Sequence, residues 1–341
     1  MSEESLKALF YPFESGMKPI SAGSKVLFIN GQVCGGLSYI AQCDLTAQQY
    51  FRPYASALEQ AGYKTVTEVE GSGFDVALVH AGRQREETTF ALAAAINAVR
   101  PDGVIFSAAA NDAGGKRLEA DFENLGLLPS AISKYKSRVV IAENRKLDRR
   151  RIDAALEAGS YQSVLKNEYI SRPGVFCWNR IDAGSALLAE ALPALTGRGA
   201  DFGCGYGYLS AHVLKSGTVS ELTCIDADAR AVEACRRTIG QKDVNERRVA
   251  YAWTDITNPR EILPTGLDWI VMNPPFHEGA AANPRIGTAF IERAAACLRP
   301  SGALWMVANA GLPYEKILAA KFSRSDRLRE DKGYKVYKAE K

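Results

Sequence analysis

The chain has 341 residues, of which 47% are hydrophobic and 24% are charged, and a formal net charge of +3. This length and balance predict two globular domains with full hydrophobic cores and exclude a chain that is disordered throughout. No run approaches the roughly 18 consecutive apolar residues of a membrane helix, and the acidic residues 1–4 do not resemble a signal peptide, so we expect a cytoplasmic protein. The seven cysteines are scattered and lack C-x-x-C spacing, which argues against a disulfide framework and predicts no bound metal.

The first half of the chain alternates between strand-like and helix-like segments. Residues 25–31 and 74–80 are apolar runs typical of buried strands, and an alanine-rich segment at 90–98 follows the second of them. An Arg-Pro-x-Gly turn at residues 100–103 then leads into a further apolar run. This alternation is typical of a parallel α/β sheet.

The middle of the chain contains a predicted linker and a predicted helix. Residues 160–169 form a plausible linker strand, and the sequence Arg-Pro-Gly-Val-Phe at 172–176 interrupts regular structure. Residues 181–190 have the periodicity of an amphipathic helix. Read alone, Asp182 is best interpreted as the cap of that helix and Ser185 as a packing residue.

A glycine-rich loop follows at residues 199–210, where glycines alternate with other residues after an acidic position. Glycine allows a ligand to approach the backbone closely. The pyrophosphate-binding fingerprint of dehydrogenases requires its third glycine at the position that Tyr208 occupies, so that version of the motif fails. The loop around Asp201, Gly203 and Gly205 therefore suits a nucleoside without phosphates.

Two acidic residues come after the next two strand-like runs. Asp226 ends the run at 221–226, about where a ribose-binding acid follows a glycine loop. Asp255 follows the run at 249–253, and its carboxylate could accept a hydrogen bond from an adenine amino group. The alternative is that these acids are turn or helix caps, with Asp226 or Asp228 capping the helix that begins near residue 229.

The sequence Asn-Pro-Pro-Phe at residues 273–276 directly follows an apolar run. Prolines donate no N–H, so the carbonyl groups around Pro274 stay free to accept hydrogen bonds. Asn273 adds a side-chain carbonyl, and Phe276 could stack on a planar ring. The motif predicts a clamp for a planar amine, and the alternative is a turn that ends a strand.

The two halves resemble each other, which predicts a duplication. Residues 74–80 parallel 267–273, and residues 98–106 parallel 297–305. The first copy lacks the alternating glycines and carries His-Ala-Gly-Arg in place of Asn-Pro-Pro-Phe. We therefore expect two tandem Rossmann-like α/β domains, each a mostly parallel sheet flanked by helices: a degenerate domain without cofactor at 1–165, and a catalytic domain at 166–341.

The order of glycine loop, acid, acid and Asn-Pro-Pro-Phe turn resembles the class I S-adenosylmethionine-dependent methyltransferases. Together with the segments 173–176, 307–314 and 335–338, it is similar to the RsmC-type ribosomal RNA guanine-N2 methyltransferases. The resemblance implies that the protein is a monomeric enzyme that methylates guanine N2 in 16S ribosomal RNA, as free RNA or in the small subunit. It also implies roles for ten residues: Asn273, Pro274 and Phe276 in catalysis, and Asp182, Ser185, Asp201, Gly203, Gly205, Asp226 and Asp255 in binding S-adenosylmethionine. Tyr206 and Tyr208 depart from the family, which usually has smaller residues there.

Other acceptors and one non-enzymatic function stay open at this point. Large-subunit guanine, a release-factor glutamine or DNA adenine would use a similar turn, and a decayed RNA-binding protein would need no chemistry. His277 could be a general base, although turn histidines more often act as hydrogen-bonding scaffolds. Basic runs at 134–138, 145–151 and 321–338 are either solvated faces or phosphate contacts. For the first domain, the hypothesis is RNA binding through Arg149, Arg150 and Arg151.

Overall fold

The computed structural model describes residues 2–82, 84–145, 149–242, 248–275, 277–278, 281–282 and 284–341, without the side chains of 277, 278, 281, 282 and 284. The chain divides into two compact units, Met1–Ser160 and Tyr161–Lys341. The boundary expected at residue 165 falls just inside the second unit. The expected linker strand there is instead a short antiparallel hairpin of β8 (Gln162–Val164) and β9 (Tyr169–Ser171), which is fastened to the second unit because Thr238 bonds the backbone of Ile170.

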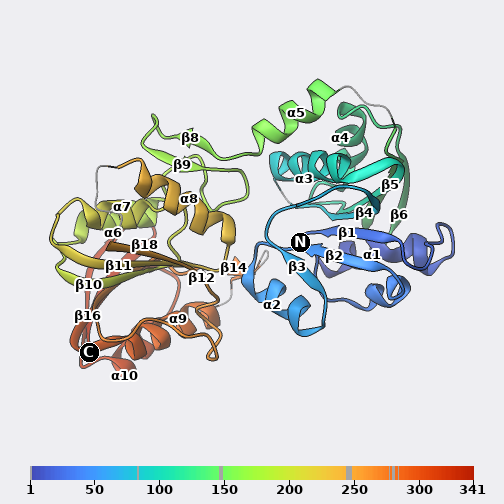
Figure 1. Ribbon diagram of the computed structural model, residues 1–341. Helices are drawn as coiled ribbons and strands as arrows, with labels where there is room; N and C mark the ends of the chain where they lie inside the picture. Colours follow the sequence, from blue (N-terminus) through green and yellow to red (C-terminus); the bar gives the residue numbers. More distant parts are fainter. Residues whose placement is uncertain are drawn as a thin grey trace. The chain divides into compact units, whose positions relative to one another are not determined.

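The first unit is a seven-stranded sheet flanked by helices (Figure 1). The first five strands in the sheet pair in parallel. The sixth is antiparallel to both of its neighbours, because a tight hairpin rather than a helix joins it to the seventh. The strands lie in the order β3 (Lys64–Val66), β2 (Asp44–Gln48), β1 (Lys25–Ile29), β4 (Phe74–His80), β5 (Val99–Ala110), β7 (Ser137–Glu143) and β6 (Ser130–Lys134). Its helices are α1 (Glu3–Glu14), η1 (Gly35–Ile40), α2 (Arg52–Gln60), α3 (Arg85–Ala98), η2 (Gly115–Arg117), α4 (Leu118–Asn124) and α5 (Arg149–Ala158).

The second unit repeats this sheet strand for strand. The order is β12 (Val249–Trp253), β11 (Val219–Asp226), β10 (Gly197–Phe202), β13 (Leu267–Met272), β16 (Leu298–Asn309), β18 (Tyr334–Glu340) and β17 (Arg324–Asp331). Its helices are α6 (Ala183–Ala191), α7 (Tyr208–Leu214), α8 (Ala229–Gly240), α9 (Pro284–Cys297) and α10 (Glu315–Lys321), and a two-residue pair, β14 (His277–Glu278) and β15 (Ala281–Ala282), follows β13. The predicted fold class, two tandem Rossmann-like α/β units, is confirmed.

Side chains of the second sheet alternate between two cores. Trp269 and Val271 of β13 face the core under α6, α7 and α8, whereas Ile270 and Met272 face the core under α9 and α10. Figure 1 shows these helices on opposite faces of the sheet. Because both faces are covered, the central strands are largely apolar and form continuous hydrophobic runs in the sequence, whereas the edge strand β17 is mostly charged.

An ion-pair clasp at the start of the fourth strand occurs in both units. Asp75 accepts hydrogen bonds from Arg100 Nε at 2.7 Å and from the backbone N–H of Lys25 at 2.8 Å. Asp268 accepts the equivalent bonds from Arg299 Nε at 2.6 Å and from the N–H of Arg198 at 2.7 Å. The pKa of both carboxyls lies below its usual value because of these bonds. This shared detail supports the predicted duplication.

Among the described residues, no helix is both long enough and apolar enough to span a bilayer.

Candidate functional site

The glycine loop joins β10 to α7 at the carboxyl edge of the second sheet. Gly203, Gly205 and Gly207 have positive φ angles of 81°, 53° and 90°, a conformation that side-chain-bearing residues adopt at a cost. A Cβ atom at Gly205 would meet nothing within 4 Å, and one at Gly203 would have its nearest neighbour at 3.8 Å, whereas at Gly207 it would press on Cys235 Sγ at 2.9 Å. Gly207 is therefore needed for packing, while Gly205 borders open space and a Cβ atom at Gly203 would make only ordinary contacts.

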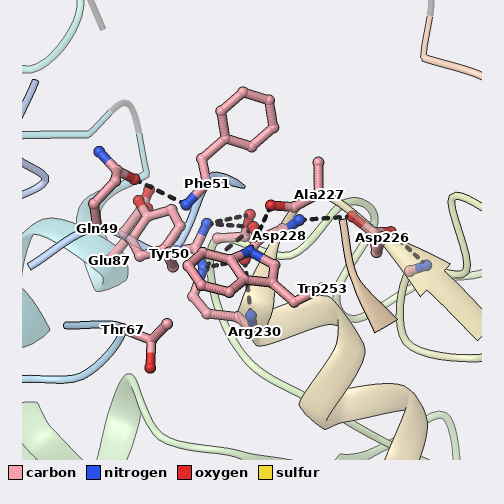
Figure 2. Close-up of polar contacts among 12 residues, drawn as sticks. Gln49, Tyr50, Phe51, Thr67, Glu87, Asp226, Ala227, Asp228, Arg230 and Trp253 are labelled. Carbon is pink, nitrogen blue, oxygen red and sulfur yellow. Dashed lines mark hydrogen bonds and ion pairs between the residues drawn. The ribbon is translucent and has the colours of Figure 1, made fainter. Parts of the chain in front are cut away.

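Asp226 fixes this loop from the end of β11. Its carboxylate accepts hydrogen bonds from the backbone N–H of Gly205 and of Asp228, both at 2.9 Å (Figure 2). Burial raises the pKa of Asp226 to about 6. The capping role that the sequence left open belongs to Asp228, which accepts from the N–H of Arg230 at the start of α8. Asp226 thus lies beside the loop, as a ribose-binding acid would.

Asp201 lies beneath the loop and is fully buried. Ser210 donates a 2.6 Å hydrogen bond to its Oδ2, while Oδ1 has no hydrogen-bond partner among the residues that the structure describes. Burial raises the pKa of Asp201 to about 7. That oxygen is itself buried, and Asp201 is not among the residues that line the cavity described below.

Asn273 is held in one orientation by the beginning of α6. Its side-chain nitrogen donates to Asp182 Oδ2 at 2.8 Å and to Ser185 Oγ at 2.9 Å. Asp182 also caps α6 by accepting from the N–H of Ser185 at 2.8 Å. A carboxylate only accepts hydrogen bonds, so the amide nitrogen of Asn273 must face it and the carbonyl oxygen Oδ1 must face the other way. Oδ1 has no hydrogen-bond partner among the residues that the structure describes, so the network presents an acceptor at the end of β13.

A small cavity of about 50 Å³ lies between the glycine loop, Asn273 and the beginning of α6. Five of the residues singled out in the sequence line it: Asp182, Ser185, Gly203, Gly205 and Asn273. Packing of the second sheet brings them together from α6, the glycine loop and the end of β13. The other lining residues were not predicted as site residues, although Tyr206 and Tyr208 were noted as departures from the family; they are Phe176, Cys177, Cys204, Tyr206, Tyr208 and Leu209.

Phe176 is the most distinctive of those residues, since its side chain is 62% exposed although it is aromatic. The turn that carries it is anchored because Arg230, itself paired with Asp228, donates to the carbonyl oxygen of Gly174 at 3.3 Å. The segment 173–176 was part of the family resemblance, but exposure of the ring is decided by tertiary structure and had no local signal.

The remaining site predictions lie away from the cavity lining or outside the described residues. Pro274 is buried next to Asn273. Asp255 follows β12 and closes a turn, with Oδ1 accepting from the N–H and hydroxyl of Thr257 at 2.9 and 2.6 Å. Phe276 lies outside the described residues, as does the side chain of His277.

The two tyrosines that depart from the family pattern line the cavity and also pack against the core. Tyr206 packs edge-on against Tyr169 with ring centroids 5.5 Å apart, and its hydroxyl donates to the carbonyl oxygen of Arg180. Tyr208 lies 5.9 Å from the same ring. Their bulk is accommodated by Tyr169, so the loop keeps its open face.

The equivalent edge of the first unit is filled by its own polar side chains. Gln49 donates to the carbonyl oxygen of Gly31 at 2.7 Å, and Gln48 accepts from the N–H of Asn30 at 3.2 Å. Asn30 in turn donates to the carbonyl oxygen of His80 at 2.9 Å. All four side chains of this group, Asn30, Gln48, Gln49 and His80, are buried.

Comparison with known proteins gives consistent matches. The family model described as "Methyltransferase small domain" matches residues 166–338. Proteins named "Ribosomal RNA small subunit methyltransferase C" are 39% identical over 173 residues in Stutzerimonas stutzeri and 37% identical over 164 residues in Shewanella loihica. These matches cover 50% and 48% of this chain and 50% and 46% of the relatives, so the chain matches about half the length of those proteins.

A solved structure matches nearly the whole chain. It is described as a T. thermophilus 16S rRNA N2 methyltransferase (RsmC) in complex with AdoMet and guanosine, and it is 25% identical with a TM-score of 0.79. The match covers 98% of this chain and 92% of that one. With the family model spanning the whole of the second sheet and its site, this chain belongs to the methyltransferase small domain family.

Proposed function

We propose that this protein transfers a methyl group from S-adenosylmethionine to the exocyclic N2 of a guanine in 16S ribosomal RNA. The observation that carries the proposal is the fixed amide of Asn273, whose nitrogen is held by Asp182 and Ser185 beside the open glycine loop. The free Oδ1 can accept a hydrogen bond from an amine placed next to a cofactor in that loop. The printed names of the relatives support the choice of acceptor.

The residues around the loop fit the cofactor. Open space at Gly205 and the lack of close contacts at Gly203 would admit it against the backbone, and Asp226 lies where a ribose hydroxyl could donate to it. The free oxygen of Asp201 suits an ammonium group, directly or through water. Asp255, one strand further along the same edge, is proposed to accept from the adenine amine. When bound, S-adenosylmethionine supplies an electrophilic methyl group on a sulfonium.

The chain's own contribution to the reaction is to hold the acceptor nitrogen. The lone pair of guanine N2 is delocalised into the ring, so the amine reacts only when its N–H bonds are held and its remaining electron density is aimed. Asn273 Oδ1 and the carbonyl oxygen of Pro274 are proposed to accept those N–H bonds, and Phe276 to stack on the base. Positioning of this kind is worth roughly 7–11 kcal/mol in well-oriented reactions.

No strong base is required in this scheme. Methyl transfer leaves a positive charge on N2, which makes its N–H acidic. The proton can then leave to water or a nearby acceptor. Asp182 is unsuited to this because its Oδ2 already accepts bonds from both Ser185 and Asn273. Its role is to orient Asn273.

Other acceptors with a planar nitrogen would fit the same clamp, and the names of the relatives favour 16S guanine over them. The open cavity in the second unit argues against a purely non-catalytic protein. Since ribosomal RNA is a cytoplasmic substrate, we also propose that the protein acts in the cytoplasm. We propose that it acts as a monomer, which size-exclusion chromatography with light scattering would test.

The test is methylation of 16S ribosomal RNA by the full chain, followed by mass spectrometry of the nucleosides. The expected product is N2-methylguanosine at one site, with free RNA and assembled small subunits assayed in parallel. Methylation of another nucleoside would reject guanine N2 as the acceptor. Absence of any S-adenosylmethionine binding in a titration would reject the enzyme itself.

A further inference from the structure

The first unit carries an exposed cluster of aromatic and basic residues, here called the tyrosine–lysine patch. It consists of Lys7 and Tyr11 from α1 and of Lys134, Tyr135 and Lys136 from the turn between β6 and β7. The two rings meet edge to face with centroids 6.2 Å apart. Lys7 Nζ lies 4.4 Å from the centroid of Tyr135, and Lys134 Nζ lies 4.8 Å from that of Tyr11. All five side chains are at least partly exposed.

The turn that presents this patch is built at a conformational cost. Tyr135 and Lys136 both adopt left-handed backbone conformations, with φ of 50° and 52°. Two-residue hairpin turns of this kind favour Asn and Gly, because a Cβ atom is disfavoured at positive φ. The corresponding turn of the second unit has Lys332 and Gly333 at these positions, with glycine at the second one. The first unit therefore keeps an aromatic and a lysine where the fold favours smaller residues.

The lysines of the patch also differ from the other basic runs in being unpaired. In the tail, Arg324 pairs with Asp326, Arg327 with Glu330, and Arg329 with Glu190, each at 2.8 Å. Within the described part of the chain, no carboxylate forms an ion pair with Lys7, Lys134 or Lys136. Their positive charge is thus available to an outside partner.

The segment first considered for RNA binding is less suitable. Arg149 already donates to Asn97 at 2.8 Å and pairs with Asp153 at 3.4 Å on α5. Among the described residues, no aromatic ring contact involves Arg149. Charge without a stacking surface offers only phosphate contacts, whereas the tyrosine–lysine patch offers both kinds of contact.

We propose that the tyrosine–lysine patch binds an unpaired segment of the RNA substrate. The lysines would neutralise phosphates, and a base would stack on Tyr11 or Tyr135, which is how proteins generally hold single-stranded nucleic acid. The inference rests on the proposed function, because it names where the same RNA is gripped. The cofactor site lies in the other unit, so the two can be tested separately.

The first experiment removes charge from the full-length protein. In the Lys7→Ala/Lys134→Ala/Lys136→Ala variant, affinity for a fluorescent single-stranded 16S fragment should fall on the order of 10- to 100-fold, and the dependence of log K on log salt should become shallower by about two. The matched control, Arg324→Ala/Arg327→Ala/Arg329→Ala, changes net charge equally and should have less than about a third of that effect on the slope. Equal losses in the two variants would overturn the assignment to this patch.

The second experiment separates stacking from charge. Tyr135→Asn suits the left-handed backbone and removes the ring, so single-strand binding should weaken about tenfold, whereas Tyr135→Phe should keep it. A duplex of the same sequence should respond little to either change. An identical response of duplex and single strand would contradict base stacking.

Failure of this inference can be distinguished from failure of the proposed function. If the parent protein binds S-adenosylmethionine and methylates RNA while the triple-lysine variant binds RNA unchanged, the patch is not the grip and the enzyme stands. If naked RNA binding is unchanged but binding to assembled small subunits falls, the patch contacts a ribosomal protein and the RNA proposal is rejected.

Discussion

Each unit has its own seven-stranded sheet with the same strand order, and the two sheets differ at their carboxyl edges. In the second unit the ends of β10 and β13 border an open cavity, while in the first unit the equivalent edge is filled by buried amides. Strand order, the ion-pair clasp and the pairing of the last two strands are alike in both. The scaffold is thus maintained by contacts that do not depend on the residues at this edge, so the two copies differ there and keep the same fold.

A single pair of positions illustrates the difference. Gln49 directly follows β2, and Asp226 is the last residue of β11. Gln49 accepts a 2.9 Å hydrogen bond from the N–H of Phe51, and Asp226 accepts one of the same length from the N–H of Asp228 (Figure 2). The other polar atom of each side chain, Nε2 of Gln49 or Oδ2 of Asp226, bonds the preceding loop, but one donates and the other accepts. Gln49 donates to a loop carbonyl, while Asp226 accepts from the N–H of Gly205. The second unit therefore has a carboxylate at this edge where the first has an amide. Its loop turns a backbone N–H toward that side chain, where the first loop turns a carbonyl.

The fastening between the first helix and the fourth strand is also shared. In the second unit Ser185 binds Asn273 at 2.9 Å, and in the first Ser5 lies 2.8 Å from Nε2 of His80. Ser2 caps α1 as Asp182 caps α6. His80 is buried and its pKa is lowered to about 3 by that burial, so it is neutral. The link is therefore structural in both units, and in the second unit it lies beside the cavity.

The largest effect is expected from removing the asparagine of this link. Asn273→Ala should lower kcat on the order of a thousandfold, because the acceptor amine loses its hydrogen-bond partner in the transition state. Affinity for S-adenosylmethionine should change less than about threefold. Single-turnover kinetics and calorimetric titration measure the two quantities. His80→Asn in the first unit should alter neither, and unchanged turnover in Asn273→Ala would falsify the assignment.

The buried Asp201 of the second unit, which stands where the first unit has Phe28, should lower the stability of that unit as pH rises, whereas the buried His80 of the first unit acts in the opposite direction. The folded protein keeps a proton on Asp201 up to about pH 7, whereas an unfolded chain releases it near 3.8. The folded state binds more protons in this window, so the free energy of unfolding should fall as pH rises from about 4 to 7, on the order of 3 kcal/mol.

Chemical unfolding at several pH values measures this dependence. The difference between the parent and Asp201→Asn isolates it, because other carboxyls contribute equally to both proteins. Parallel curves for the two proteins would show that Asp201 does not titrate in this range.

Asp226 and Gln49, which occupy equivalent positions in the two units, provide a test variant and its matched control for cofactor binding. Asp226→Ala should weaken S-adenosylmethionine binding about 10- to 100-fold, as expected for the loss of a hydrogen bond to a charged group. Gln49→Ala should leave cofactor affinity unchanged. If titration gave the same affinity for Asp226→Ala as for the parent, the ribose role would have to be abandoned.

Asp182 tests whether the helix cap orients the asparagine or binds the cofactor. If its role is orientation, Asp182→Ala should lower kcat about tenfold with a smaller change in cofactor affinity, because the amide of Asn273 becomes free to rotate. Ser185→Ala should show the same pattern more weakly. The reverse pattern, with weaker cofactor binding and normal kcat, would assign Asp182 to the cofactor.

The smallest effect is expected from the shared clasp. Asp75→Ala and Asp268→Ala should each lower the free energy of unfolding of their own unit by about 1 kcal/mol, since both pairs are partly exposed. Differential scanning calorimetry of the two variants would measure this. A much larger loss in one unit would show that the clasp is not equivalent in the two copies.

Much of the site was visible in the sequence because it follows strand ends. The glycine loop, Asp226 and Asn273 each come directly after an apolar run, and parallel strands bring their carboxyl ends to one edge. The duplication was visible for the same reason, since both copies repeat the same runs and turns. The ion pairs of the basic tail could not be predicted from the sequence, because Arg329 pairs with Glu190, which lies far away in the chain.

The sequence by itself determined the α/β alternation, the two copies and which strand ends carry polar groups, because these depend on local hydrophobic periodicity and turn residues. Only the tertiary structure decided that Asn273 bonds Asp182, 91 residues earlier, that Asp201 is buried under the loop, and that Asp228 rather than Asp226 caps α8. Asn273 and Asp182 are far apart in sequence, and packing of α6 onto the sheet brings them together, whereas the cap of α8 is a local choice between two neighbouring acids. The direction of a hydrogen bond, and with it the chemistry of the site, is set at that level.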